Sequence, residues 1–166
     1  MKGLSEKEME VVADLDFRKL SYFTLKDVEK HFTNLRQRTN TIYKLRKKGR
    51  IIKLNRSKFF LVPIKAQSGG WADNPLIVAD EIFNGKDYVI GGWYAAYYWK
   101  LTDQIPMQVD IYTTRRQGTM RVLGKRFVFH RSTKKKIAKA VPVITENYQV
   151  KMLDKNYVRA WLRSRR

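Results

Sequence analysis

The chain has 166 residues, 43% of them apolar and 13% aromatic, which is enough for one hydrophobic core or for two smaller ones. Its formal net charge of +20, from 35 Lys and Arg against 15 Asp and Glu, favours a polyanionic partner such as nucleic acid. The absence of cysteine excludes disulfides, thiolate metal sites and cysteine nucleophiles, and no apolar run approaches the roughly 20 residues needed to span a bilayer.

The charge is distributed unevenly along the chain. Acidic residues are concentrated in the first 29 positions, and none occurs between Glu29 and Asp73 or within residues 111–145. Small, polar residues at 66–70 (AQSGG) have the composition of a flexible connection. We therefore predict two domains, 1–65 and 71–166, each with its own basic surface; the alternative is a loop inside a single domain.

The first predicted domain begins with three short helical patterns. Ser5 and Glu8 form a capping-box pattern that predicts a helix over about 5–15. Thr24 precedes a second amphipathic pattern that predicts a helix through residue 32. A third helix is predicted to start after Thr33 or Asn34, to run to Lys48 and to end at Gly49.

Two β-prone runs follow, 50–54 and 58–62, around the turn-forming residues 55–57 (NRS). They predict a hairpin that ends at Pro63, which cannot donate a ladder hydrogen bond. Three helices and a β-hairpin in about 60 residues correspond to the winged helix-turn-helix plan, whose last helix enters the DNA major groove. The predicted fold class is α+β, a winged helix-turn-helix followed by a small mixed α+β domain.

The third helix has a polar face suited to DNA. At 100° per residue, Leu35, Ile42 and Leu45 share an apolar side, on which Arg38 is the one misfit. The opposite side has no acid and carries residues that hydrogen-bond base edges or phosphates. Those residues are Arg36, Gln37, Asn40, Lys44 and Lys47.

We predict base contacts from Arg36, Gln37 and Asn40, because they lie toward the N-terminal end of the helix. A lysine ammonium has little preference for one base edge and therefore suits phosphate contact. The predicted phosphate contacts are Lys44, Lys47 and Lys48 of the helix, with Arg56 and Lys58 at the hairpin. The alternative is that this charged face is an ordinary solvated helix surface.

The second predicted domain starts with a helix from Pro75, capped by Asn74 and closing near Gly85. Residues 91–99 (GGWYAAYYW) predict a helix that is apolar nearly all round and buried. Asp154 is expected to cap a final helix. Strands are predicted between these helices. They cover 108–113, 120–123, 125–131, 141–144 and 148–153.

Four segments of this domain resemble the AbiEi family of abortive-infection antitoxins and transcriptional regulators. They are 88–99 (YVIGGWYAAYYW), 101–106 (LTDQIP), 109–114 (VDIYTT) and 126–131 (RFVFHR). The resemblance covers roughly residues 74–131. It implies a repressor that binds double-stranded DNA with inverted repeats, and an antitoxin that opposes a nucleotidyltransferase-type toxin from the same operon. A protein that reads inverted repeats commonly binds as a dimer, so a homodimer on DNA is a further expectation.

A second basic surface is predicted in this domain. An enzyme would need a convergent acid-base set, and the best pair, Asp110 with Lys125, has no second acid nearby, so we expect no catalytic or metal site and no cofactor. An RNA- or single-strand-binding protein without a toxin partner is the alternative function. We expect a cytoplasmic protein with no membrane partner. The predicted second basic surface comprises Arg115, Arg116, Arg121, Lys125 and Arg126.

Overall fold

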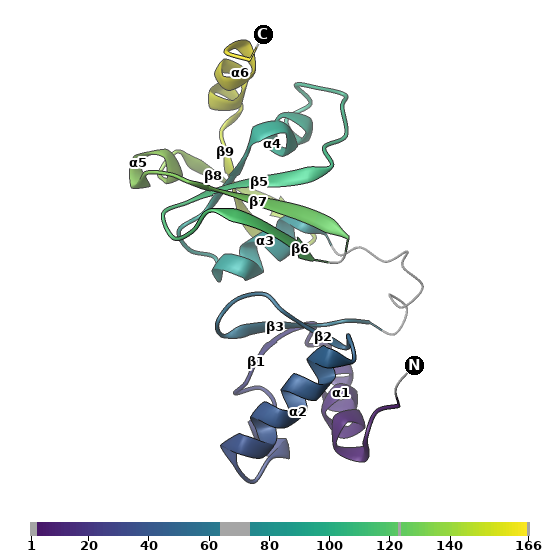
Figure 1. Ribbon diagram of the computed structural model, residues 1–166. Helices are drawn as coiled ribbons and strands as arrows, with labels where there is room; N and C mark the ends of the chain where they lie inside the picture. Colours follow the sequence, from purple (N-terminus) through teal and green to yellow (C-terminus); the bar gives the residue numbers. More distant parts are fainter. Residues whose placement is uncertain (1–2, 64–73, 123, 166) are drawn as a thin grey trace. The chain divides into compact units, whose positions relative to one another are not determined.

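The computed structural model describes residues 3–63, 74–122 and 124–165, and the chain divides into two compact units, Met1–Trp71 and Ala72–Arg166 (Figure 1). We call them unit 1 and unit 2. The described residues form six α-helices and two sheets, so the fold class is α+β as predicted. The segment 66–70, interpreted above as a linker, lies outside the described residues. No described helix has the length and apolar character needed to cross a bilayer.

Unit 1 consists of helices and a small antiparallel sheet with strand order β1-β3-β2. The β2–β3 hairpin is confirmed, and its turn is held by the Asn55 carboxamide oxygen, which accepts from the backbone N–H groups of Ser57 and Lys58. In chain order the elements are α1 (Glu6–Phe17), β1 (Tyr22–Thr24), the 3₁₀ turn η1 (Glu29–His31), α2 (Leu35–Lys47), β2 (Ile51–Lys53) and β3 (Lys58–Leu61).

The predicted ends of α1 and α2 are confirmed. Ser5 and Glu8 make the reciprocal bonds of a capping box at the start of α1. Asn34 caps α2 by accepting from the backbone N–H of Gln37 at 2.8 Å. Gly49, directly after the C-cap of α2, has a φ of +72°, the left-handed conformation that glycine adopts without strain.

The second predicted helix, from Thr24 to residue 32, is wrong. Thr24 ends strand β1 instead, and only a 3₁₀ turn forms at 29–31. Thr24 is held in β1 by pairing with Lys58 of β3, and its backbone N–H and hydroxyl both donate to the Asp27 carboxylate, at 2.6 and 2.8 Å. Val28 is nevertheless buried, as the apolar pattern required.

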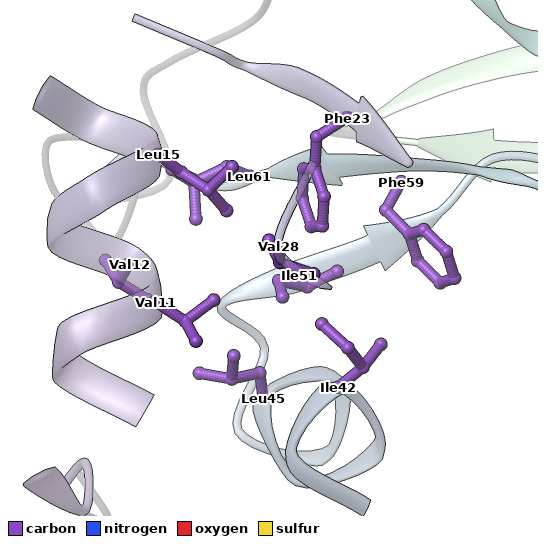
Figure 2. Close-up of a cluster of buried hydrophobic side chains, with 10 residues drawn as sticks. All are labelled: Val11, Val12, Leu15, Phe23, Val28, Ile42, Leu45, Ile51, Phe59 and Leu61. Atoms are coloured by element: carbon purple, nitrogen blue, oxygen red, sulfur yellow. The ribbon is translucent and has the colours of Figure 1, made fainter. Parts of the chain in front are cut away.

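The core of unit 1 lies between α1, α2 and the sheet (Figure 2). Ile42 and Leu45 of α2 are buried there, but Leu35, which we assigned to the same side, is 63% exposed, because it opens the first turn of α2, ahead of the part that meets the core. Arg38 lies at the edge of the core, with its guanidinium 3.2 Å from Glu29. The buried cluster is Val11, Val12, Leu15, Phe23, Val28, Ile42, Leu45, Ile51, Phe59 and Leu61.

Unit 2 is a mixed sheet with strand order β6-β7-β5-β4-β9-β8 and helices on both faces. Within it, β5 runs parallel to β7 and β4 runs parallel to β9, and the other neighbours are antiparallel. The helices are α3 (Pro75–Phe83), α4 (Gly92–Tyr98), α5 (Lys134–Ile137) and α6 (Lys155–Arg163). The strands are β4 (Val89–Gly91), β5 (Gln108–Thr113), β6 (Gly118–Val122), β7 (Lys125–Arg131), β8 (Ala140–Thr145) and β9 (Tyr148–Leu153).

The predicted helix caps and strands of unit 2 are largely confirmed. Asn74 and Asp154 cap α3 and α6 with their side chains, and the five predicted strands all form. Strand β4 and the short helix α5 were not predicted, because the former is only three residues long and the latter is four residues within a lysine-rich run. The segment 91–99 does form a helix, α4, after one residue of β4.

Helix α4 is less buried than predicted. Gly92, Ala95 and Ala96 face the interior, whereas the large side chains of Trp93 and Tyr97 are each 40% exposed. The fully buried residues of α4 are therefore its small ones. The reason is the closeness of α4 to the sheet, since a Cβ at Gly92 would lie 2.6 Å from an Asp110 carboxylate oxygen.

Candidate nucleic-acid interface

The outer face of α2 carries the predicted DNA-contacting residues. Arg36, Gln37, Asn40, Lys44 and Lys47 are all exposed, while Thr41, Ile42 and Leu45 are buried on the other side. The structure thus places these five side chains together on one helix face. Whether they contact DNA stays a prediction.

Tyr43 belongs to the same face and was missed. It is 52% exposed and lies under the Lys47 ammonium, 5.2 Å from the ring centroid. The helical wheel contained this signal, because residue 43 lies about 60° from residue 40 on the outward side. A tyrosine there adds an apolar ring for a thymine methyl group and a hydroxyl for phosphate.

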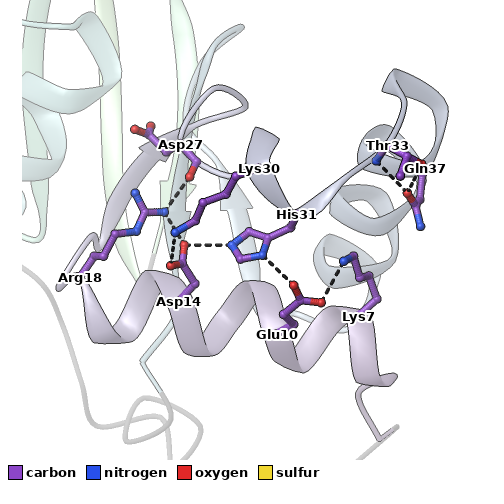
Figure 3. A network of polar contacts seen from close by, with 9 residues as sticks. All are labelled: Lys7, Glu10, Asp14, Arg18, Asp27, Lys30, His31, Thr33 and Gln37. Carbon is purple, nitrogen blue, oxygen red and sulfur yellow. Dashed lines mark hydrogen bonds and ion pairs between the residues drawn. The ribbon is translucent and has the colours of Figure 1, made fainter.

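The start of α2 is fixed by its own polar side chains. The Gln37 carboxamide oxygen accepts from the backbone N–H of Thr33 at 3.3 Å and from the Thr33 hydroxyl at 3.2 Å (Figure 3). The oxygen of Gln37 is therefore occupied, and its NH₂ group remains as the donor toward a ligand. In this arrangement Gln37 can donate to a base acceptor but cannot pair bidentately with adenine.

Glu10 and Asp14 of α1 are held in ion pairs with cations outside the outer face of α2. Asp14 lies within 3.0 Å of His31, Lys30 and Arg18, and Glu10 lies within 2.9 Å of Lys7 and His31 (Figure 3). The hydrogen bonds from His31 and Lys30 hold the pKa of Asp14 far below its ordinary value. The hydrogen bonds from Lys7 and His31 likewise lower the pKa of Glu10.

Lys48 does not belong to the exposed face. Its ammonium lies 2.5 Å from the carboxylate of Glu8, a residue that is 1% exposed, and also donates to the Gly3 carbonyl. Burial acts to raise the pKa of Glu8, but the hydrogen bond and charge of Lys48 outweigh it and the net pKa is lowered. Lys48 therefore holds α2 to α1, and its assignment to phosphate contact has no geometric support.

At the hairpin, Arg56 is exposed in the turn, whereas Lys58 is half-buried on β3, paired in register with Thr24 and electrostatically close to Asp27. Of the two hairpin residues predicted to contact phosphate, Arg56 is thus the one that is exposed. Within the described residues no ion pair involves the exposed cations of this interface. They are Arg36, Lys44, Lys47 and Arg56.

The second basic surface is not a single surface. Arg121 and Arg126 are cross-strand partners on β6 and β7 and share one face of the sheet. Lys125, the neighbour of Arg126, points to the opposite face because side chains alternate along a strand.

The two remaining arginines of that predicted surface have partners inside unit 2. The Arg115 guanidinium lies 3.1 Å from the Asp87 carboxylate, and that of Arg116 stacks 4.1 Å from the centroid of the Phe129 ring. Of the five predicted residues, only Arg121 and Arg126 are exposed on a common face.

Asp110 and Lys125 do not converge. Asp110 is buried on β5, where it accepts from Gln108 at 3.1 Å and contacts His130 at 2.8 Å. Its side chain faces the same side of the sheet as Gln108, and Lys125 faces the other side. Asp110 and Lys125, named above as the best pair for an enzyme, therefore do not form a catalytic pair in this structure.

Comparison with known proteins adds no family to this description. A scan against models of protein families finds no match, and neither does a search of the curated proteins. The likeness of residues 74–131 to the AbiEi family thus rests on the sequence motifs alone.

Proposed function

We propose that the protein is a cytoplasmic, sequence-specific regulator that binds double-stranded DNA through unit 1. In this proposal unit 1 is a winged helix-turn-helix in which the turn η1 occupies the place of the second helix. The element order α1-β1-η1-α2-β2-β3, with the third strand between the other two, supports that assignment. Helix α2 enters the major groove and the β2–β3 hairpin contacts the backbone.

The observation that carries the proposal is the segregation of charge in unit 1. Three of the α1 carboxylates, those of Glu8, Glu10 and Asp14, are paired with cations of unit 1, which are Lys7, Arg18, Lys30, His31 and Lys48. The cations on the outer face of α2 have no acidic partner among the described residues, so DNA phosphates can pair with them without breaking an internal ion pair. An ordinary solvated helix would mix both signs.

Each side chain of the interface has a proposed role. Arg36 donates to guanine, Asn40 pairs with adenine, and Gln37 donates through its free NH₂ group. Lys44, Lys47 and Arg56 contact phosphates. In unit 2, Arg121 and Arg126 provide a further pair of cations for the DNA backbone.

The regulatory role follows from the AbiEi resemblance. It supports a repressor of its own operon, acting at inverted repeats, and an antitoxin that opposes a nucleotidyltransferase-type toxin. The test is co-expression with the product of the neighbouring gene, in which a toxin would stop growth alone and be tolerated in the presence of this protein.

DNA recognition is tested by selecting preferred duplexes from a random library with the full chain. We expect Arg36→Ala and Asn40→Ala to lose about 1–3 kcal/mol at one operator position each. Lys47→Ala should weaken selected and random duplexes equally and lower the salt slope by about 0.9. Lys30→Ala is the matched control, since Lys30 is already paired with Asp14, and it should change neither quantity. Equal losses from all four substitutions would refute the assignment of this face.

The partial exposure of Trp93 and Tyr97 favours RNA or single-stranded nucleic acid as a second candidate ligand, because exposed rings stack on unpaired bases. Competition between duplex DNA and single-stranded RNA of equal length separates the two. A preference for RNA that Trp93→Ala abolishes, and that Arg36→Ala leaves intact, would replace the proposal above.

A further inference from the structure

Unit 2 has an apolar patch around the end of α4 that nothing in the proposed DNA contact uses. An open pocket of about 560 Å³ lies there, with Tyr97 and Tyr98 among its lining residues. Ile105 is 71% exposed and Met107 is 88% exposed. Three exposed large apolar side chains, Tyr97, Tyr98 and Ile105, thus line one pocket, and Met107 follows two residues later. Clustered exposed apolar side chains are typical of an interaction surface.

The end of α4 beside the patch is fixed by hydrogen bonds. The backbone leaves α4 through Lys100, whose φ is +54°, and the N–H of Leu101 donates to the Ala96 carbonyl at 2.9 Å. The Trp99 indole N–H donates to the Leu153 carbonyl at 2.9 Å, and the Thr102 hydroxyl oxygen accepts from the backbone N–H of Gln104. The part of the patch formed by the end of α4 is therefore preformed, which reduces the ordering entropy that binding costs there.

The charges at the rim of the pocket favour a second copy of this chain as the partner. Lys100 and Asp103 both line the pocket, and neither makes an ion pair with any other described residue. A two-fold axis brings a residue i of one copy to residue j of the other and j to i. Opposite charges on the same patch therefore form two equivalent ion pairs in a two-fold dimer, whereas an acidic partner would repel Asp103.

The patch combines a pocket with exposed apolar side chains that could fill the same pocket of a second copy. It has a pocket lined by two tyrosines and, on the same segment, an exposed Ile105 and Met107. We propose that two copies of the chain associate through this patch, with Met107 of each copy in the Tyr97–Tyr98 pocket of the other and Lys100 facing Asp103 across the axis. This association does not require DNA. Its consequence, cooperative binding to inverted repeats, rests on the proposed function.

The association is tested by sedimentation of the full chain in about 0.3 M salt, which screens the repulsion between two strongly basic molecules. We expect a concentration-dependent dimer that Met107→Asp weakens by roughly tenfold or more, as for a central apolar residue of an interface. Ile144→Asp is the control, because Ile144 is 77% exposed on β8, outside the patch, and should leave the dimer unchanged. A chain that stays monomeric, or a dimer indifferent to Met107→Asp, overturns the proposal.

Charge reversal tests the two-fold geometry itself. Lys100→Glu should weaken the dimer, because it places two acids opposite each other, and Lys100→Glu combined with Asp103→Lys should restore it. A double variant no better than the single one refutes the reciprocal pairing. Binding to a single half-site separates this inference from the DNA proposal. If half-sites are bound while the chain stays monomeric, only the dimer is wrong; if the dimer forms but no duplex is bound, only DNA recognition is wrong.

Discussion

The two units place a similar sequence feature, a long run without acids, in different ways. In unit 1 the run covers a helix and a hairpin, and its free cations collect on the outer face of α2. In unit 2 the run covers strands, and its cations separate onto different faces, with Arg126 on one and Lys125 on the other. A basic stretch of sequence therefore becomes one surface or several, depending on the period of the element that carries it.

The partners of the cations differ as well. Unit 1 pairs several of its partly buried cations with carboxylates, such as Lys48 with Glu8 and Arg38 with Glu29. Unit 2 places several of its cations on aromatic rings, such as Arg116 on Phe129 and Lys136 on Tyr112. Its buried carboxylate, Asp110, is bound by His130 and Gln108 and lies against the backbone of α4. Each variant described below changes residues of only one of the two units.

The largest effect is expected from Gly92→Ala in unit 2. Gly92 has a φ of +60°, and an added Cβ would lie 2.6 Å from the Asp110 carboxylate. The left-handed backbone and the overpacking together should cost about 2–4 kcal/mol. Amide hydrogen exchange should show the loss of protection in unit 2 and an unchanged unit 1. Gly3→Ala, where a Cβ meets nothing, is the control; equal loss in both units would mean that the two cores are coupled.

The next effect separates two adjacent lysines of unit 1. Lys48→Ala leaves the carboxylate of Glu8 buried without its partner and should destabilise unit 1 by about 2 kcal/mol. Lys47→Ala should leave stability within about 0.5 kcal/mol and weaken DNA binding. Urea unfolding and duplex titration of both variants measure the contrast. If Lys48→Ala keeps its stability but binds DNA more weakly, Lys48 contacts DNA as first predicted, and its pair with Glu8 contributes little to stability.

The sequence predicted best those features that depend on neighbouring residues. The caps at Ser5, Asn34 and Asp154 and the turn at Asn55 were identifiable because a side chain bonds to backbone two or three positions away. The helical repeat of 3.6 residues per turn correctly separated the buried Ile42 and Leu45 from the outward residues of α2.

Features set by distant partners could not be predicted in this way. Lys48 looked like its neighbour Lys47 until the fold brought Glu8, 40 positions away, against it. The turn at 24–32 depends on pairing between β1 and β3, which has no signal within the segment itself. The exposure of Trp93 and Tyr97 reflects how closely α4 approaches the sheet.

A smaller effect is expected from acid on unit 1. The pKa of Asp14 is lowered in the folded protein, so its interactions with His31 and Lys30 stabilise the fold above the ordinary pKa of aspartate, near 3.8, and are lost as the pH falls below it. The loss should be about 1 kcal/mol or less, since Lys30 is largely exposed. Asp14→Asn should flatten this acid dependence in thermal unfolding of unit 1. Asp16→Asn, on the exposed side of α1, should retain the slope of the unsubstituted protein.

The smallest effect compares two adjacent cations of unit 2. If Arg121 and Arg126 contact phosphate from their shared face, Arg126→Ala should lower the slope of log affinity against log salt by about 0.9, and Lys125→Ala, on the other face, should leave it unchanged. Salt titrations on one random duplex measure both slopes, and using random DNA removes any contribution from base recognition by unit 1. Equal decreases would show that unit 2 meets DNA edge-on, through both faces of β7, and no decrease in either would restrict DNA contact to unit 1. Because side chains alternate between the two faces of β7, comparing Arg126→Ala with Lys125→Ala shows whether one face of unit 2 binds DNA or whether its cations only add to the net charge.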